Sequence, residues 1–392
     1  MSQKKKLLFC LRDFNHGGIP SCLLQLLRLF DHERYEVEIY CGDQSGVYKE
    51  PFKEFNVLPQ DTLMWFLMAN YRKLAGWRKL VAIIIKLVRH VLRKMGMDLF
   101  TIHTKNTAAS LSKNGYDLII AYAEGFSTWL AADIIAPRKI AWIHCEYDNL
   151  VDSSFRRKDK QAYEHFDKIV CVSEAARDSF VRSFPKFQYK TVVISNVFDC
   201  DNVRKLARDA SNMDSRFVSD SSFKIISVGR VCAVKQYYHI PAIVSRIVQH
   251  EKVVWFIVGP GPEEEVNVVR KNIEEYDVGD SVVLLGAQEN PYKYIARADM
   301  LAVTSSSEAY PTVINEAKAL GIPIICTRFG SVLEMVNEAY CSISTIEEMS
   351  EKILNILRDR RKYVEMRSAL KDLEFNNEAL LKKIYSLIEN YD

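Results

Sequence analysis

Two glutamates, Glu308 and Glu316, lie eight positions apart within SSSEAYPTVINEAKALGIPII, residues 305–325. An apolar run precedes this segment, so we predict a strand end, a polar loop and then a helix. We expect Pro311 to be the first helical residue and Gly321 to close the helix. Glu308 then lies in the loop and Glu316 inside the helix. Unpaired N–H groups and the dipole at such a helix start can bind an anion, while the carboxylates can bind hydroxyl groups.

This segment resembles the signature of the family 4 glycosyltransferases, which are retaining enzymes of the two-domain GT-B architecture. In that family a Glu-x7-Glu element surrounds the nucleotide-sugar donor. The resemblance implies that Glu308 contacts the transferred sugar and that Glu316 holds the ribose hydroxyls. It also implies that main-chain groups of the loop bind the sugar and the diphosphate, and these belong to Ala309, Tyr310, Pro311 and Thr312. The alternative is that both glutamates are ordinary surface acids.

Two cations follow a predicted strand in SVGRVCAVKQ, where Arg230 and Lys235 lie five residues apart. Cations at this place could clamp the two phosphates of a nucleotide diphosphate and stabilise the charge on the leaving group. Solvated surface cations are the other interpretation. The resemblance favours the first, because it implies that Gly229, Arg230 and Lys235 form the family's Gly-Arg…Lys donor element. Gln236 departs from the glycine that many members have at that position.

Three further groups of residues follow predicted strands. Gly17 and Gly18 open a helix, so the backbone there could approach a diphosphate, although a plain tight turn is the alternative. His144 ends the strand in KIAWIHC, where a lone histidine is more often a core residue. The resemblance implies that the glycines face the donor phosphates and that His144 contacts the donor sugar. It also implies main-chain contacts with the nucleotide base from Gly286, Ala287 and Gln288.

Short apolar runs alternate with longer helical patterns, which indicates parallel sheets covered by helices and hence an α/β fold. We expect two doubly wound Rossmann-like domains facing a cleft, as the GT-B resemblance implies. They are an acceptor-binding domain over residues 1–198 and a nucleotide-sugar-binding domain over 199–372, with a helix over 373–392 packing back toward the first domain. The predicted strands are residues 6–11, 35–41, 117–123, 139–145, 168–173 and 190–196, then 223–229, 253–259, 281–286, 300–305 and 322–327.

Composition excludes several classes of protein. The 392 residues are 48% hydrophobic and 26% charged, as in a soluble globular protein, and a net charge of +3 implies no nucleic-acid partner. The nine scattered cysteines favour free thiols in a reducing cytosol. The N-terminus does not match a signal peptide, and no apolar run is long enough to span a membrane. We therefore expect a cytoplasmic protein, with peripheral association at the inner face of the cell membrane as an open question.

The sequence contains no nucleophile-elbow motif and no metal-ligand cluster. Its Asp-x-Asp element, Asp199 and Asp201, falls in the predicted linker, where we interpret it as a helix cap or linker charge. We expect no metal and no cofactor, because Arg230, Lys235 and helix N-termini can neutralise the diphosphate.

A basic amphipathic segment, YRKLAGWRKLVAIIIKLVRHVLRK, lies between Asp61 and Asp98, and no acid separates those two residues. On a helix its apolar residues cover one side and a cationic stripe lies on the other, formed by Arg72, Lys79, Lys86 and Arg93. The helix could lie on an anionic membrane surface, or it could be a core helix with a solvated basic face. The apolar residues Met64, Trp65, Phe66 and Met68 favour the membrane.

The resemblance implies a retaining, metal-independent glycosyltransferase with Glu308, His144, Arg230 and Lys235 in its catalytic set. It would move a hexose or N-acetylhexosamine from a nucleotide diphosphate sugar, a UDP-sugar by family frequency, to a hydroxyl of a saccharide acceptor. If membrane association holds, that acceptor is lipid-linked. The element Asn290-Pro291-Tyr292 resembles members that build polysaccharides, which implies cell-surface polysaccharide or lipopolysaccharide biosynthesis. The alternatives are a nucleotide-sugar epimerase of similar fold and a non-catalytic sugar-nucleotide-binding partner of another transferase.

Overall fold

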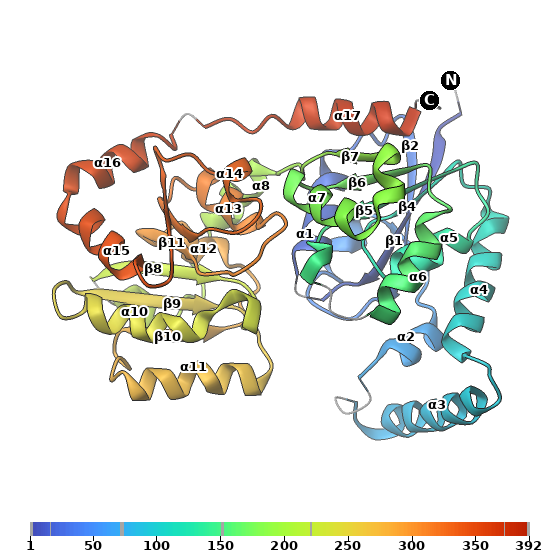
Figure 1. Cartoon of the computed structure of the whole chain (residues 1–392), viewed down its shortest axis with the longest axis horizontal. Helices are drawn as coiled ribbons and strands as arrows, with labels where there is room; N and C mark the ends of the chain where they lie inside the picture. Colours follow the sequence, from blue (N-terminus) through green and yellow to red (C-terminus); the bar gives the residue numbers. More distant parts are fainter. Residues whose placement is uncertain are drawn as a thin grey trace. The chain divides into compact units, whose positions relative to one another are not determined.

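Two parallel β-sheets, each covered by helices on both faces, organise the chain (Figure 1). The structure is a computed structural model that describes residues 3–15, 17–70, 74–149, 153–219, 222–371 and 373–389. Its internal contacts divide the chain into two units. Unit 1 comprises Met1–Asn196 and Ala379–Asp392, and unit 2 comprises Val197–Glu378.

The sheet of unit 1 has seven strands in the order β3-β2-β1-β4-β5-β6-β7, and its neighbouring strands are parallel. The six strands predicted in this half are confirmed, and the two-residue β3 was not predicted. The strands are β1 (Lys5–Asp13), β2 (Tyr35–Asp43), β3 (Asn56–Val57), β4 (Leu118–Ala121), β5 (Arg138–Ile143), β6 (Lys168–Cys171) and β7 (Thr191–Val193).

The sheet of unit 2 has six strands in the order β10-β9-β8-β11-β12-β13, again with parallel neighbours. The five predicted strands are confirmed, and β13 was not predicted because CSIS carries two serines. The strands are β8 (Phe223–Val228), β9 (Val253–Val258), β10 (Val282–Gly286), β11 (Met300–Val303), β12 (Ile324–Thr327) and β13 (Cys341–Ser344).

Burial on both faces explains why the strands are apolar throughout. Along β9, Trp255 and Ile257 belong to one buried cluster of unit 2, whereas Phe256 and Val258 belong to the other. Successive side chains of a strand point to opposite faces, so both faces of this sheet must be covered. This two-sided core confirms the predicted doubly wound α/β class.

The covering helices follow from the crossover connections between parallel strands. In unit 1 they are α1 (Gly18–Arg28), α2 (Thr62–Met68), α3 (Gly76–Lys94), α4 (Leu99–Leu111), α5 (Phe126–Asp133), α6 (Ser153–Tyr163) and α7 (Glu174–Ser183). In unit 2 they are α8 (Cys200–Ala207), α9 (Ser215–Ser219), α10 (Ile240–Ile247), α11 (Glu263–Glu275), α12 (Tyr292–Ile295), α13 (Thr312–Ala319), α14 (Val332–Met335), α15 (Met349–Arg358) and α16 (Arg360–Ser368).

The last helix, α17 (Asn377–Glu389), docks on unit 1. The Tyr385 hydroxyl accepts a hydrogen bond from the backbone N–H of Asp31 at 2.8 Å, and Arg138 donates to the carbonyl of Ile388 at 3.1 Å. The hydroxyl of Tyr35 donates to Glu389 at 2.5 Å. These bonds tie the end of the described chain to the first sheet.

Each sheet has a topological switch point, where the strand order reverses direction. In unit 1 it lies between β1 and β4, and in unit 2 it lies between β8 and β11. The loops that follow these strands diverge to opposite faces of the sheet and leave a crevice at its carboxyl edge, where α/β proteins bind ligands. The loops after β1, β4, β8 and β11 are therefore the first places to look for a site.

Helix α3 is an exception to the burial of apolar residues. Ala82 is its one buried residue, whereas Leu80 and Ile84 are 64% and 59% exposed. The interpretation of this segment as a core helix is therefore wrong, because its apolar side does not face the core. Lys79, Lys86 and Arg93 of the predicted stripe lie on α3, whereas Arg72 lies outside the described residues.

The expectation that the apolar residues between 64 and 68 favour the membrane is wrong for Met64 and Phe66, whereas Trp65 and Met68 are half-buried. Met64 is fully buried and Phe66 is 8% exposed, because α2 packs against β2. Asp61 caps α2 by accepting a bond from the N–H of Met64 at 2.9 Å. Among the described residues, no helix is long and apolar enough to cross a membrane.

Candidate active site

An ion pair joins the two loops at the switch point of unit 2. Lys235 ends a short 3-10 helix (Ala233–Lys235) after β8, and Glu308 lies in the loop after β11. The ammonium group of Lys235 contacts Oε1 of Glu308 directly. The two side chains are 20% and 15% exposed, so a ligand at this edge of the sheet can still reach them.

Hydrogen bonds hold Glu308 in a defined position. The Ser305 hydroxyl donates to Oε1 of Glu308 at 2.7 Å, and the Ser331 hydroxyl donates to the backbone carbonyl of Glu308 at 3.0 Å. A carboxylate oxygen that accepts from both a serine and a lysine has little freedom to rotate. Glu308 is thus a prepositioned acid rather than a solvated surface residue.

The loop that carries Lys235 is bonded to the loop that carries Glu308. Thr304 donates through its hydroxyl to the carbonyl of Lys235 at 2.6 Å, and the N–H of Ser306 donates to the carbonyl of Val234 at 2.9 Å. Gln236 adopts a left-handed conformation with φ of 53°. This conformation explains why glycine is common there in the resembled family and why glutamine is tolerated at a small cost.

Gly229 leaves the space in which the Lys235 side chain lies. Its φ is +152°, and a Cβ there would lie 3.1 Å from Cε of Lys235 and 3.0 Å from the Tyr237 hydroxyl. The neighbouring Gly259 is tighter, since its Cβ would lie 2.0 Å from the Gly229 carbonyl oxygen. Arg230, next to Gly229, is exposed at the same strand end. The glycine turns after β8 and β9 therefore serve close backbone packing beside the cations.

Glu316 lies on the buried side of α13, with 6% of its surface exposed. Burial raises the pKa of Glu316 to about 7, against the lowering effects of a hydrogen bond with Thr312 and of the positive charge of Lys235. Pro311 is the N-cap of α13 and not its first helical residue, because its ψ of 108° is extended. Gly321 follows the helix with φ of +70°, as predicted.

The residues expected at the nucleotide base form an exposed turn after β10. Gly286 and Ala287 are exposed, and Gly286 has φ of +67°. The side-chain amide of Gln288 donates to the carbonyl of Leu285 at 3.0 Å and accepts from the Tyr294 hydroxyl at 3.2 Å. Because the Gln288 side chain is occupied in this way, the exposed main chain of the turn is the part that can meet a ligand.

The predicted donor loop begins at the partly buried Glu308 and continues into α13. Ala309 and Pro311 are buried, whereas Tyr310 and Thr312 are partly exposed. The first N–H groups of an α-helix lack intrahelical acceptors, so the start of this eight-residue helix offers donors to an anion. The structure thus brings Lys235, Glu308 and Glu316 together.

In unit 1, Gly17 and Gly18 follow β1 at the switch point. Gly17 is extended with φ of 169°, and a Cβ on Gly18 would meet nothing within 4 Å. The backbone at the start of α1 is therefore unobstructed on the side to which a Cβ of Gly18 would point.

His144 directly follows β5, and its backbone is held by Glu124, which follows the adjacent strand β4. The Glu124 carboxylate accepts bonds from the N–H groups of His144 and Cys145, the latter at 2.9 Å. The imidazole packs 4.9 Å from the Tyr122 ring, and no described residue bonds to its buried Nε2. Burial lowers the pKa of His144 to about 3, so the ring is neutral at physiological pH.

Glu124 is a candidate that sequence reasoning missed. Its signal was an acid just after the run DLIIAYA, on a strand that pairs with the strand of His144 through Ala121 and Ala141. Residues that follow neighbouring parallel strands lie at the same sheet edge. Strand adjacency, which was needed to connect the two residues, could not be deduced from the sequence.

The described residues contain no group of three or more His, Cys, Asp or Glu side chains that could hold a metal ion. The Asp-x-Asp element has a structural role in part: the Asp199 carboxylate accepts a bond from the N–H of Asn202 at 3.1 Å and caps α8. The helix-cap interpretation of Asp199 is therefore confirmed.

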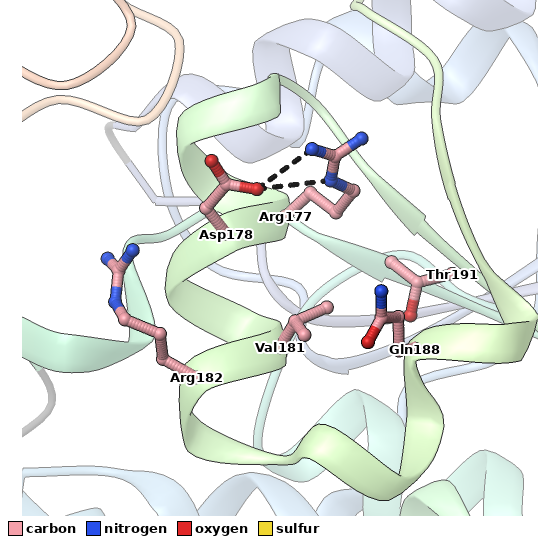
Figure 2. Close-up of a pocket in the computed structure, with 6 residues that line it drawn as sticks. All are labelled: Arg177, Asp178, Val181, Arg182, Gln188 and Thr191. Atoms are coloured by element: carbon pink, nitrogen blue, oxygen red, sulfur yellow. Dashed lines mark hydrogen bonds and ion pairs between the residues drawn. The ribbon is translucent and has the colours of Figure 1, made fainter.

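A surface pocket in unit 1 lies apart from the predicted site residues. Figure 2 shows that Arg177 and Asp178 pair with each other at its rim. Arg182 pairs with Asp148, so both arginines already have acidic partners. Its lining residues are Arg177, Asp178, Val181, Arg182, Gln188 and Thr191, and none of them belongs to the predicted donor set.

Comparison with known families places two models side by side on this chain. The model described as Glycosyltransferase Family 4 matches residues 16–202, and the model described as Glycosyl transferases group 1 matches residues 210–372. The first covers most of unit 1, and the second covers most of unit 2 with its Lys235–Glu308 pair.

Individual similar proteins agree with these families. A Campylobacter jejuni protein named N-acetylgalactosamine-N,N'-diacetylbacillosaminyl-diphospho-undecaprenol 4-alpha-N-acetylgalactosaminyltransferase is 23% identical over 80% of this chain and 79% of its own length. An uncharacterised glycosyltransferase of Methanocaldococcus jannaschii is 25% identical over 43% of this chain, and the match spans 41% of that relative. The crystal structure of Anabaena HepE with UDP-glucose has a TM-score of 0.73 at 16% identity, covering 98% of this chain and 99% of HepE. That likeness shows a shared fold.

Proposed function

We propose that this chain, which belongs to the family 4 glycosyltransferases of GT-B architecture, is a retaining, metal-independent enzyme. It transfers a hexose or N-acetylhexosamine from a UDP-sugar to a hydroxyl of a saccharide acceptor. The observation that carries the proposal is the Lys235–Glu308 pair at the switch point of unit 2. In this pair, a cation that can bind the diphosphate lies beside an acid that can bind the sugar. Both lie at the carboxyl edge of the sheet, where doubly wound sheets bind nucleotides.

The proposed roles follow from the charge and burial of each group. Lys235 and the exposed Arg230 neutralise the diphosphate, helped by the N–H groups at the start of α13. Glu308 binds the transferred sugar and favours the positive charge that develops on it. Glu316, one turn into α13, accepts bonds from the ribose hydroxyls. The turn from Gly286 to Gln288 contacts the base through its main chain.

Retention of configuration follows from a front-face displacement. The bond between the anomeric carbon and the phosphate oxygen breaks while the acceptor oxygen forms a bond on the same face. The acceptor's proton passes to the departing phosphate oxygen, so no strong protein base is required. Electrostatic stabilisation of the leaving diphosphate by Lys235 and Arg230 then supplies much of the rate enhancement.

Unit 1 is proposed to bind the acceptor and to add neutral contacts to the donor. Gly17 and Gly18 offer an unobstructed backbone for the phosphates, and His144 offers an unprotonated imidazole for the sugar. A neutral ring can donate one hydrogen bond and accept another, as recognition of sugar hydroxyls requires.

The choice of donor and acceptor is supported by the named similarities. HepE binds UDP-glucose in its crystal structure, and the name of the Campylobacter jejuni relative specifies a diphospho-undecaprenol-linked saccharide acceptor. We therefore propose a UDP-sugar donor and a lipid-linked saccharide acceptor in cell-surface glycan assembly. This acceptor would bring the enzyme to the inner face of the cell membrane.

A panel of nucleotide sugars incubated with the purified chain tests the proposal. We expect slow release of UDP from one donor by hydrolysis, and loss of that release in Glu308→Gln. An epimerase would convert the sugar without releasing UDP, whereas a non-catalytic partner would bind the nucleotide and leave it intact. Either of these results in place of UDP release would overturn the assignment as a transferase.

A further inference from the structure

Helix α3 exposes a continuous apolar face. Its members, here called the α3 apolar face, are 44% to 65% exposed, and they are Trp77, Leu80, Ile84, Leu87, Val88 and Val91. Their spacing of three and four residues places them on one side of an α-helix. Scattered single apolar residues are normal on protein surfaces, but a contiguous set of this kind marks an interaction surface.

The side of α3 next to the apolar face attaches the helix to unit 1. Val81, Ala82, Ile85 and Leu92 are buried or half-buried where α3 packs against α2 and α4. The half-buried Arg89 donates to the carbonyl of Leu67 in α2 at 3.3 Å. Figure 1 shows α3 at the periphery of unit 1, beyond α2. The apolar face is therefore held outward by specific packing.

Positive charge lies on the polar side of α3. The seven-residue spacing of Lys79, Lys86 and Arg93 lines these cations along the helix, next to the packed side and away from the α3 apolar face. No acid occurs between Asp61 and Asp98 in the sequence. Arg93 approaches Asp98 at 4.0 Å, at the end of the row. The row is thus positive along its length, with one acid close to its last member.

We propose that α3 docks this protein on an anionic lipid bilayer, with the α3 apolar face in the headgroup–acyl boundary and the positive charge of Lys79 and Lys86 attracting the helix to the anionic headgroups. A helix lying in the interface combines these two features, apolar burial and attraction to anionic lipid. Pairing with a second copy of the same face would bring two helices that carry cations and no acid side by side, and this like charge disfavours it. The inference concerns how the protein reaches a membrane and does not depend on glycosyl transfer.

The first experiment measures co-sedimentation of the full chain with phosphatidylglycerol-containing vesicles. We expect Leu87→Glu to weaken binding at least tenfold, because the apolar burial of the leucine is lost and a buried charge opposes insertion. Ile135→Glu is the matched control, since Ile135 is 79% exposed in the same unit but lies outside α3. This control should bind as wild type, and both variants should keep the wild-type melting temperature because the replaced side chains are exposed.

The second experiment tests the charged row. Lys79→Gln with Lys86→Gln should weaken binding by roughly fivefold for each cation removed. The control pair, Lys113→Gln with Lys160→Gln, removes exposed lysines elsewhere in unit 1 and should have little effect. Vesicles of phosphatidylcholine alone should bind wild type weakly, because this zwitterionic lipid carries no net negative charge.

Three results would overturn the proposal. They are no binding of wild type to anionic vesicles, unchanged binding by Leu87→Glu or by the Lys79/Lys86 pair, and a wild-type dimer that Leu87→Glu dissociates without any vesicle binding. Hydrolysis of a nucleotide sugar in solution, assayed in parallel, keeps the two proposals separable. Failure of hydrolysis with intact vesicle binding rejects the transferase assignment alone, and the reverse pattern rejects α3 docking alone.

Discussion

The two sheets share one topology but have different residues at their switch points. In unit 2, the loops after β8 and β11 bring a lysine and a glutamate into an ion pair. In unit 1, the loops after β1 and β4 bring two unstrained glycines and a glutamate whose carboxylate is occupied by backbone N–H groups. The two charges at the first site pair with each other but stay partly exposed to a ligand, whereas the charge of Glu124 at the second site supports the backbone beside His144.

This difference separates what the fold determines from what the loops determine. A doubly wound sheet places several loops at one edge, and the side chains on those loops decide which chemistry occurs there. In the proposed function, side-chain cations neutralise the diphosphate at the unit 2 edge, whereas the unit 1 edge adds uncharged groups, which are the backbone at Gly17 and Gly18 and the ring of His144. If that division is correct, substitutions at the unit 2 site should lower the transfer rate most, and substitutions at the unit 1 site should lower it less.

The largest expected effect comes from removing the cation of unit 2. Lys235→Ala should reduce transfer by roughly 10³-fold, because the charge on the departing diphosphate loses its fixed partner. Steady-state kinetics with a soluble acceptor analogue measures this. Lys271→Ala, an exposed lysine on α11, is the matched control and should retain wild-type rates. Near wild-type transfer by Lys235→Ala would show that the unit 2 site contributes no more to catalysis than the unit 1 site.

A second variant keeps the shape of the site and removes its negative charge. Glu308→Gln should lower kcat by roughly 10²-fold while UDP affinity changes little, because its proposed contact is with the sugar. Calorimetric titration with UDP measures the affinity, and the kinetic assay measures kcat. A loss of UDP binding equal to the loss of kcat would assign Glu308 to the nucleotide instead.

The equivalent change in unit 1 should be milder. His144→Phe removes the neutral ring's hydrogen bonds but keeps an aromatic side chain against Tyr122, so we expect transfer to fall roughly tenfold with UDP affinity unchanged. Rates that fall as far as those of Lys235→Ala would show that unit 1 contributes as strongly as unit 2, contrary to the comparison.

Protonation of Glu316 should produce a smaller, pH-dependent effect. Its pKa of about 7 lies above the unfolded value near 4.3, so the native state binds the extra proton and loses stability as pH rises from about 4.5 to about 7. The full loss is roughly 3 kcal/mol, and Glu316→Gln should abolish it in urea unfolding measured across this range. Wild-type UDP affinity should fall roughly fivefold below pH 7, as the carboxylate that accepts from ribose is neutralised. A variant with the same pH profile as wild type would contradict this role.

The smallest expected effect is that of chelation. If Lys235 and Arg230 neutralise the diphosphate, treatment with EDTA should leave the transfer rate unchanged, and added magnesium should not raise it. A rate that EDTA abolishes and magnesium restores would show that the cations of unit 2 are insufficient by themselves.

Sequence patterns predicted the sheets well because burial on both faces makes strands such as VVWFIV apolar without interruption. The same reasoning missed β13, whose residues Cys341–Ser344 are half polar. The resemblance assigned Lys235 and Glu308 to one donor site, but their ion pair was not predicted, since the two are distant in sequence. Glu124 was missed because its meaning depends on which strands are neighbours.

Helix α3 shows a different limit. Its periodicity predicted an amphipathic helix correctly, yet the same pattern describes a helix that buries its apolar side and one that exposes it. The decision depends on whether neighbouring elements cover that side, and α2 and α4 contact the other one. Patterning within one segment carries no information about which of its sides the rest of the chain covers.

The ion pair between Lys235 and Glu308 also has a consequence for selectivity. In the absence of a ligand, each group compensates the charge of the other. An uncharged monosaccharide carries no negative charge that could replace Glu308 as the partner of Lys235. A nucleotide diphosphate brings its own negative charge and can share Lys235 with the acid. If Lys235 binds the diphosphate as proposed, UDP should be a competitive inhibitor of the nucleotide sugar, whereas the free sugar should not inhibit at comparable concentrations.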